Sequence, residues 1–269
     1  MDPAYDRSSK TEGGEFVNGS PTIAPAIDLQ VPTSGPIPRQ VSVEEGYQRW
    51  AETYDHTPNP LLALEERCLL PLLPNIAGKR VLDLACGTGR WLEKLSAKRP
   101  ELAIGVDQSQ AMLAVAREKP AIGVRLARAN CLKLPFHNAV FDLAICSFAL
   151  QHIGELDELA TESWRVMRAP ADLYITDLHP KAYEAGWRTG FRDRQGAMQI
   201  ETASHSEAEI VTLFNNVGFE LVQAIECFVG EPERPVFESA GKSRIFDTAR
   251  AVPAIMILHF QSGSGAANT

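Results

Sequence analysis

Several features that mark membrane, nucleic-acid-binding and secreted proteins are scarce in this sequence of 269 residues. No apolar run approaches the roughly 20 residues that a bilayer-spanning helix needs, so no membrane span is expected. The formal net charge is −8, whereas proteins that bind nucleic acids present a basic surface to the phosphates. The absence of a basic excess argues against a nucleic-acid partner and favours a small molecule.

Cysteines are few and show no pairing pattern. The five are odd in number and include no CxxC pair, at positions 68, 86, 131, 146 and 227. We expect reduced intracellular thiols, and neither a disulfide framework nor a metal site. The N-terminus has no basic segment ahead of an apolar one, so no secretory signal and a cytoplasmic location are expected.

Composition divides the chain into a leader, one domain and a tail. Residues 1–42 contain six prolines and four glycines without a sustained period, which is typical of a flexible leader. Residues 43–261 are expected to form one domain that carries an insertion at 179–205, and residues 262–269 to be a disordered tail. The sequence neither predicts nor excludes a homo-oligomer, because no pattern in it bears on association.

Helical and strand patterns alternate through the domain. Strands are expected at 80–85, 102–106, 123–128, 140–146, 171–177, 219–228 and 254–261, and helices around 61–69, 89–97, 109–118, 155–168 and 210–217. The early strands are short apolar runs, as in a parallel sheet that is covered on both faces. This order predicts a doubly wound, Rossmann-like α/β fold with a seven-stranded, mostly parallel sheet and helices on both faces. The last two strands, with no helix expected between them, predict an antiparallel hairpin at one edge.

The turn from Asp83 to Gly89 follows the first of these strands and leads into a helix. Gly87 and Gly89 have no Cβ, so backbone amides there can approach a charged, nucleotide-like ligand closely. A nicotinamide fingerprint needs a third glycine where this chain has Leu92, and a phosphate-binding P-loop needs a Gly-Lys-Ser/Thr sequence that is absent. A nicotinamide-dependent oxidoreductase is therefore only a residual alternative.

Residues 81–91 resemble motif I of class I S-adenosylmethionine-dependent methyltransferases, with Ala85 where the first glycine is usual. Later segments resemble further motifs of the family in the expected order, namely 105–109, 129–136, 141–153 and 164–170. The last of these segments resembles the family's R-V-L-K-P-G-G turn, whose two glycines are replaced here by Ala171 and Asp172. The resemblance covers about residues 43–228 and is to the small-molecule, ubiquinone-biosynthesis-like type.

This resemblance implies a donor, S-adenosylmethionine, and the product S-adenosylhomocysteine. The loop 85–90 would hold the methionyl end while Asp83 orients its ammonium, and Asp107 would accept the ribose hydroxyls. Asn130, where the family usually has Asp, would contact the adenine amino group. The donor-binding residues implied are Tyr47, Tyr54, Asp83, Ala85, Cys86, Gly87, Gly89, Arg90, Asp107, Gln108, Met112, Asn130, Cys131, Leu132, Ser147 and Phe148.

An apolar stripe lies ahead of the first strand. Tyr47, Trp50, Ala51 and Tyr54 are spaced i, i+3, i+4 and i+7, which predicts one face of a helix. That face either packs onto the sheet or forms a lid over the donor, since the segment resembles the "Y-x-x-W-A-x-x-Y-D" entry of ubiquinone- and polyketide-tailoring methyltransferases.

Two histidines are candidates for a general base. His152 follows the 141–153 motif and His179 follows the fifth strand, both on the expected substrate side. The plainer alternatives are a helix-cap or packing role for His152 and a turn role for His179. The insertion at 179–205 is either a substrate cover or a solvated loop or hairpin.

The sequence thus predicts a methyltransferase that acts on a small-molecule acceptor, with O- or C-methylation ahead of N-methylation. A tRNA or protein methyltransferase is the alternative within enzymes. A non-catalytic partner protein that binds adenosylmethionine is the alternative outside them.

Overall fold

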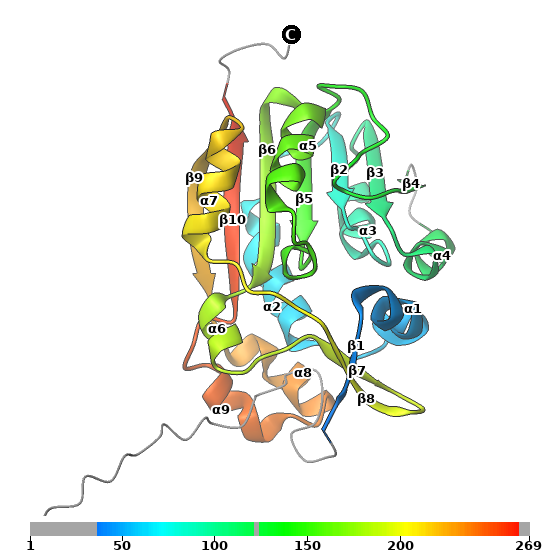
Figure 1. Ribbon diagram of the computed structural model, residues 1–269, viewed down its shortest axis with the longest axis vertical. Coiled ribbons are helices and arrows are strands. Elements are labelled where there is room, and N and C mark those ends of the chain that lie inside the picture. Colours follow the sequence, from blue (N-terminus) through cyan, green and yellow to red (C-terminus); the bar gives the residue numbers. More distant parts are fainter. Residues whose placement is uncertain (1–36, 121–123, 264–269) are drawn as a thin grey trace, which may run out of the picture.

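The computed structural model describes residues 37–120 and 124–263, and the predicted leader and tail lie outside it except for residues 37–42, 262 and 263. Two sheets organise these residues (Figure 1). A seven-stranded sheet has the order β4-β3-β2-β5-β6-β10-β9, and a three-stranded sheet has the order β1-β8-β7. The first sheet is parallel from β4 to β6, and β10 runs antiparallel to both of its neighbours. The predicted fold class is therefore confirmed.

The strands of the large sheet agree with the predicted ones to within a few residues. They are β2 Arg80–Leu84, β3 Leu102–Asp107, β4 Val124–Arg128, β5 Phe141–Ser147, β6 Met167–Leu178, β9 Phe219–Cys227 and β10 Ile255–Ser262. The strands of the small sheet are β1 Arg39–Val41, β7 Gly190–Asp193 and β8 Gly196–Ile200.

Local sequence signals place most helix ends. The helices are α1 Val43–Tyr54, α2 Pro60–Leu69, α3 Arg90–Ser96, α4 Gln110–Glu118, α5 Leu156–Val166, α6 Pro180–Glu184, α7 Glu207–Asn216, α8 Arg234–Ser239 and α9 Phe246–Ala249. Ser42, Asn59, Ser109 and Ser206 cap α1, α2, α4 and α7 through side-chain oxygens that accept backbone N–H groups. Proline at the first position of α2 has no N–H to leave unpaired.

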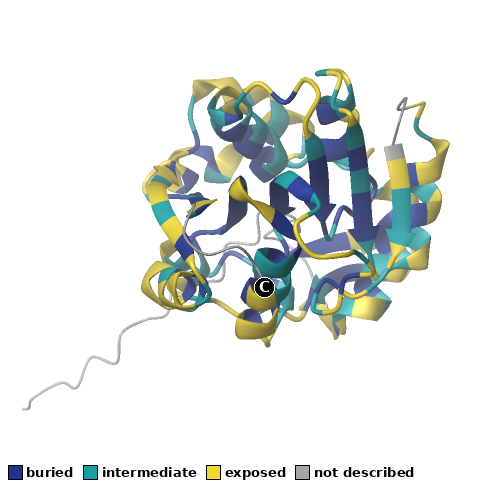
Figure 2. Cartoon of the chain, turned by 90° about the horizontal axis from the view of Figure 1, so that it is seen from above, coloured by how far each residue is buried: buried dark blue, intermediate teal, exposed yellow. Residues whose placement is uncertain are grey.

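Alternating side chains of the strands build two core layers, one on each face of the large sheet. Leu82 and Leu84 of β2 belong to the layer under α5 and α7, whereas Val81 belongs to the layer under α2 and α3. The same alternation divides Ile257 from Leu258 in β10. Figure 2 shows the buried residues concentrated on the central strands and the exposed ones on the outer faces of the helices.

The small sheet and α1 lie together at one end of the large sheet (Figure 1). Trp50 of α1 stacks on Phe191 of β7 with ring centroids 5.2 Å apart, and both side chains are buried. Strand β1, which comes from the segment assigned to the leader, pairs in parallel with β8. The insertion is thus an antiparallel β7–β8 hairpin, preceded by α6 and bound to α1 and β1.

Two connections differ from the predictions. Strands β9 and β10 pair antiparallel, but α8 and α9 lie between them in the chain, so they are not joined as a hairpin. These helices have only six and four residues, too few for a helical period to appear in the sequence. The 164–170 motif does not end in a turn, because β6 begins at Met167, directly after α5.

Among the described residues, no helix is long and apolar enough to cross a bilayer. Nor does any group of three or more His, Cys, Asp or Glu side chains in that part of the chain form a metal site. Its cysteines are all free thiols.

Candidate functional site

A cavity of about 420 Å³ lies at the carboxyl ends of β2, β3 and β5. The chain proceeds from β2 to one side of the sheet and returns at β5 to the other, and such a switch point is where ligands bind in this kind of sheet. The cavity brings together fourteen of the predicted residues, namely Tyr47, Tyr54, Asp83, Ala85, Cys86, Gly87, Arg90, Asp107, Gln108, Met112, Cys131, Ser147, Phe148 and His152.

Four predicted residues do not line this cavity. Gly89 is the last residue of the turn and the N-cap of α3. Asn130 is exposed and its Oδ1 accepts the N–H of Leu132, which also lies outside the lining. His179 caps α6 and its Nε2 lies 3.2 Å from Glu226. His179 therefore lies outside the cavity, and its turn role is the one that the structure supports.

The glycine turn is tied to the next strand by one carboxylate. The Gly87 N–H donates to Asp107 Oδ2 at 2.8 Å, and the Ser109 N–H donates to Asp107 Oδ1 at 2.7 Å. Gly87 has a φ of 54° and Gly89 one of 77°, in the region that favours glycine. Ala85 also has a positive φ, of 54°, where the motif usually has glycine. Asp107 thus fixes the turn and still presents carboxylate lone pairs to the cavity.

Gly105 of β3 explains how the fold does without a third glycine in the turn. A Cβ on Gly105 would lie 2.4 Å from Leu92 Cδ1 and 2.7 Å from Cys86 Sγ. The close approach of α3 to the sheet is therefore made at the strand, and Leu92 fills the position where a nicotinamide fingerprint has its glycine.

Two buried polar atoms in the cavity wall have no partner. Asp83 is 1% exposed and its Oδ2 accepts no hydrogen bond, while Nη1 of Arg90 donates none. Burial raises the pKa of Asp83 to about 8. One free acceptor and one free cationic donor match an ammonium and a carboxylate, the two charged groups of a free amino acid. The methionyl end of adenosylmethionine carries that pair of groups, so these residues fit the donor.

Glu65 of α2 also belongs to the site, although it was not predicted from the sequence. It is fully buried and accepts hydrogen bonds from Arg90 Nη2, Trp91 Nε1, Ser147 Oγ and Thr176 Oγ1. This carboxylate holds the guanidinium of Arg90 against the cavity wall. A signal was present, because Glu65 falls four residues after Leu61 and four before Leu69, on the apolar face of its helix.

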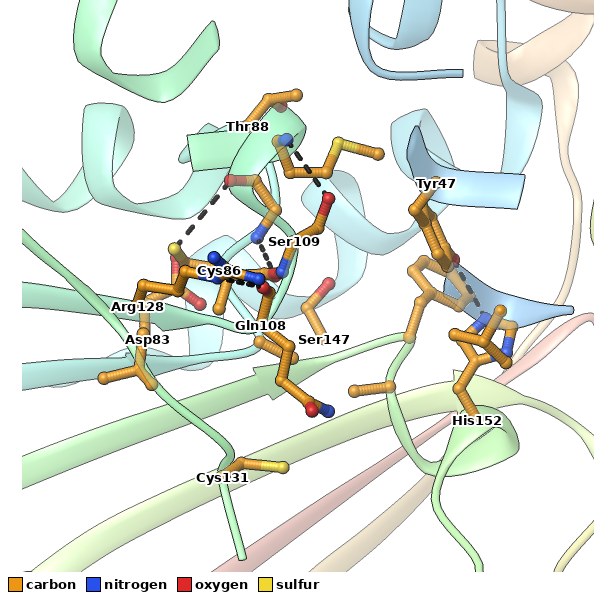
Figure 3. A pocket seen from close by; sticks show the side chains of 18 of the residues that line it. Tyr47, Asp83, Cys86, Thr88, Gln108, Ser109, Arg128, Cys131, Ser147 and His152 are labelled. Atoms are coloured by element: carbon orange, nitrogen blue, oxygen red, sulfur yellow. Dashed lines mark hydrogen bonds between the residues drawn. The ribbon is translucent and has the colours of Figure 1, made fainter. Parts of the chain in front are cut away.

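The side chains of Tyr47 and His152 point toward each other, and both lie on the side of the cavity opposite Asp83 and Gln108 (Figure 3). The Tyr47 hydroxyl is 2.9 Å from His152 Nε2, and His152 Nδ1 is 3.3 Å from the carbonyl of Glu201. Since a carbonyl only accepts, Nδ1 carries the proton and Nε2 accepts from Tyr47. Burial lowers the pKa of His152 to about 4 and raises that of Tyr47. Both groups are therefore neutral near pH 7.

Helix α1 closes this side of the cavity and is anchored at its end. Asp55 accepts a hydrogen bond of 2.6 Å from Thr88 Oγ1 in the glycine turn and pairs with Lys119 at 2.8 Å. Earlier in α1, Arg49 Nε donates to Asp193 of the hairpin at 2.9 Å. On the stripe of α1, Trp50 packs on the small sheet, while Tyr47 and Tyr54 line the cavity; the lid over the donor stays a prediction.

Similar proteins indicate which family has this arrangement of residues. Residues 81–170 match the family described as "Methyltransferase domain". A demethylmenaquinone methyltransferase of Deinococcus radiodurans is 32% identical over 108 residues, which are 39% of this chain and 45% of that protein. The chain thus spans about half the length of this curated relative. An uncharacterized methyltransferase of Emericella nidulans is 29% identical over 222 residues, 68% of this chain and 77% of that protein.

Solved structures agree on the fold. The S-adenosylmethionine-dependent methyltransferase of Mesorhizobium loti has a TM-score of 0.60 and 19% identity, and the likeness covers 76% of this chain and 100% of that one. The family match includes the glycine turn, Asp107 and the β5 loop, all of which line the cavity. Residues 81–170 thus match a methyltransferase domain, and the fold around them is that of the S-adenosylmethionine-dependent methyltransferases.

Proposed function

We propose that this protein binds S-adenosylmethionine in the 420 Å³ cavity and transfers its methyl group to oxygen or carbon of a small-molecule acceptor. The observation that carries the proposal is the pair of unpartnered atoms, Asp83 Oδ2 and Arg90 Nη1, beside the glycine turn. When bound, the donor supplies a methyl group already activated by a sulfonium, so the chain has mainly to position and shield the reactants.

Positioning is the largest contribution that this site would make. Holding two reactants at attack distance and in line lowers the barrier by roughly 7–11 kcal/mol. Asp83 and Arg90 would bind the amino-acid end, and Asp107 would accept the ribose hydroxyls with the lone pairs that Gly87 and Ser109 leave free. Tyr47 and Tyr54 would exclude water from the sulfonium side, where an aromatic face also favours a cation.

His152 would serve as a neutral hydrogen-bond acceptor and not as a strong base. With a pKa of about 4, it takes a proton from an ordinary hydroxyl only at a large cost. Its partner Tyr47 is held in place by the 2.9 Å hydrogen bond. The site therefore suits an acceptor that ionises readily, such as a phenol or a hydroquinone-like ring, and a demethylmenaquinone methyltransferase is among the relatives.

A small acceptor is favoured over RNA or protein by the cover on the cavity. Val43, Glu44, Tyr47 and Gln48 of α1 line its mouth, and Glu44 adds negative charge there. The net charge of −8 also opposes a polyanionic partner. The cytoplasmic location stays a prediction from the sequence.

Binding and turnover test this proposal separately. Calorimetric titration should show binding of S-adenosylmethionine and S-adenosylhomocysteine, with NADH failing to compete. S-adenosylhomocysteine production should then appear over a panel of phenols and hydroquinones and not with tRNA or protein. Absence of donor binding would overturn the proposal, and binding without turnover of any acceptor would favour a non-catalytic partner protein.

A further inference from the structure

A second, much smaller space adjoins the donor cavity on the side of the insertion. This recess has a volume of about 20 Å³ and shares Tyr47, Tyr54 and Phe148 with the cavity. A space of that size holds about one water molecule, or one oxygen of a ligand. An acceptor bound beside the donor would therefore reach the recess with a single polar group.

Three side chains of the recess wall offer N–H groups that no described residue accepts. Trp50 is 2% exposed and its Nε1 has no hydrogen-bond partner. Gln151 accepts the Thr189 hydroxyl through Oε1 at 2.8 Å, which leaves its Nε2 group free. Arg188 donates to the carbonyls of Tyr183 and Trp187 through Nη1 alone, each at 2.7 Å. Trp50 Nε1 is the buried one of these donors, and a buried donor without a partner in a pocket wall indicates a missing acceptor.

Among the described residues that line the recess, Arg188 is the one charged side chain, and Asp177 lies behind Gln151, whose backbone N–H it accepts. Arg188 forms no ion pair within the described part of the chain, and its guanidinium stacks over the Tyr183 ring at 3.6 Å. The wall formed by the described residues contains no carboxylate, and its remaining members include Leu61, Leu62 and Leu178. Its titratable groups are Tyr47 and Tyr54, whose pKa values burial raises, so both are neutral near pH 7. A partly buried guanidinium without a counter-ion calls for an anionic group on the ligand.

We infer that the recess formed by Arg188, Trp50 and Gln151 binds the acceptor through an anionic oxygen, so that the acceptor is an aromatic molecule bound as its phenolate or a similar oxyanion. This inference rests on the proposed function, because only a methyltransferase has an acceptor. It also fits a site whose histidine is a weak base. The oxygen would be stabilised as an anion by the guanidinium instead of being deprotonated by His152. The apolar wall and Phe148 would contact the ring.

The probe for this inference is 4-nitrophenol, whose anion absorbs visible light. It is titrated with protein, with and without S-adenosylhomocysteine, at a pH slightly below the pKa of the free phenol. The wild type should convert the bound phenol to its anion and prefer it over neutral 4-nitroanisole by about 10-fold or more, as expected for hydrogen bonds to a charged group. Arg188→Gln keeps an N–H donor for the two carbonyls but lacks the charge, and it should lose this spectral shift.

Two further variants distinguish an effect of the charge at the recess from a loss of folding. Arg194→Gln, an exposed arginine of the same insertion, should behave as the wild type. Trp50→Phe, which removes one N–H, should weaken the shift if Arg188→Gln proves unfolded by its melting curve. A spectrum that stays that of the neutral phenol, or a shift that survives in both variants, overturns the inference.

The donor titration distinguishes the two proposals. Binding of S-adenosylhomocysteine without the phenolate shift overturns only the acceptor inference. A phenolate shift that depends on Arg188, in a protein that does not bind the donor, overturns the proposed function and supports the anion site.

Discussion

Asp83 is the residue whose surroundings say most about the donor. Its buried carboxyl has a pKa of about 8, so it is mostly protonated in the empty site at pH 7. An ammonium brought to Oδ2 favours the ionised form, and binding should therefore release a proton. The free energy of donor binding then depends on pH through this one group.

We expect the affinity for S-adenosylhomocysteine to rise with pH up to the pKa of about 8 and to level off above it. Asp83→Asn should bind about 10- to 100-fold more weakly above that pKa, because a hydrogen bond to a charged partner is lost. Calorimetry in buffers of different ionisation enthalpy measures both affinity and proton release. An affinity that is independent of pH in the wild type would contradict this role.

Gly105 is a single residue under a steric constraint whose energetic cost can be measured. Its missing Cβ leaves room for Leu92 and Cys86, so Gly105→Ala should destabilise the fold by about 1–3 kcal/mol, the usual cost of overpacking. Gly154→Ala is the matched control, since a Cβ there meets nothing within 4 Å. Urea unfolding of both variants measures the difference, and equal stabilities would refute the packing argument.

Sequence reasoning found the site residues that belong to contiguous motifs and missed those that only the fold brings near. Asp83 and Asp107 lie at the carboxyl ends of β2 and β3, and such ends of parallel strands meet at one edge, so their proximity was predictable. Arg188 and Glu65 come from an insertion and from a helix ahead of the first motif, and their distances to the cavity depend on packing. Asn130 was placed by analogy with an aspartate, and its own turn with Leu132 occupies it instead.

At the scale of elements, α1 acts as a cover that is fixed by polar contacts at its C-terminal end. Asp55 joins the end of α1 to Thr88 in the glycine turn and to Lys119 after α4. Asp55→Ala should therefore increase amide hydrogen exchange along α1 and weaken donor binding several-fold, since Tyr47 and Tyr54 lose their fixed position. Glu52→Ala, an exposed acid on the same helix, should change neither. Slow exchange in α1 of Asp55→Ala would show that the small sheet alone fixes the helix.

The strands and helices that were not predicted from the sequence are all short. Strands β1 and β7 have three and four residues, and α9 has four. Segments of that length complete at most two periods of the strand pattern and little more than one turn of a helix, so their structure is decided by partners distant in the sequence, as β1 is by β8. The long periodic segments were placed correctly because their own burial pattern specifies them.

At the scale of the whole molecule, the donor and acceptor sides come from different parts of the chain. The family match spans residues 81–170 and includes Asp83, Arg90 and Asp107. The cover α1 and the recess residue Arg188 lie outside that span, on both sides of it in the sequence. The family match therefore supports the proposed donor site, whereas the proposed acceptor side rests on contacts specific to this chain.

The buried carboxyls also set how the stability of the whole fold depends on pH. Asp83 and Asp177 have folded pKa values of about 8 and about 7, both raised by burial from 3.8. An acid with a raised folded pKa holds its proton longer in the folded state, so its contribution is complete below 3.8 and is lost as pH rises through the folded value. His152, with a folded pKa of about 4, contributes above 6.5 and loses its contribution only as pH falls.

We therefore expect the free energy of unfolding, without ligand, to fall between pH 6.5 and 8 relative to Asp83→Asn. The slope of the difference is up to about 1.4 kcal/mol per pH unit, the value for one proton. The comparison with the variant is needed because other groups titrate there, Asp177 with its folded pKa of about 7 among them. Urea denaturation across this range measures both proteins. Parallel curves would mean that Asp83 ionises without cost, and saturating S-adenosylhomocysteine should remove the difference in slope by stabilising the carboxylate.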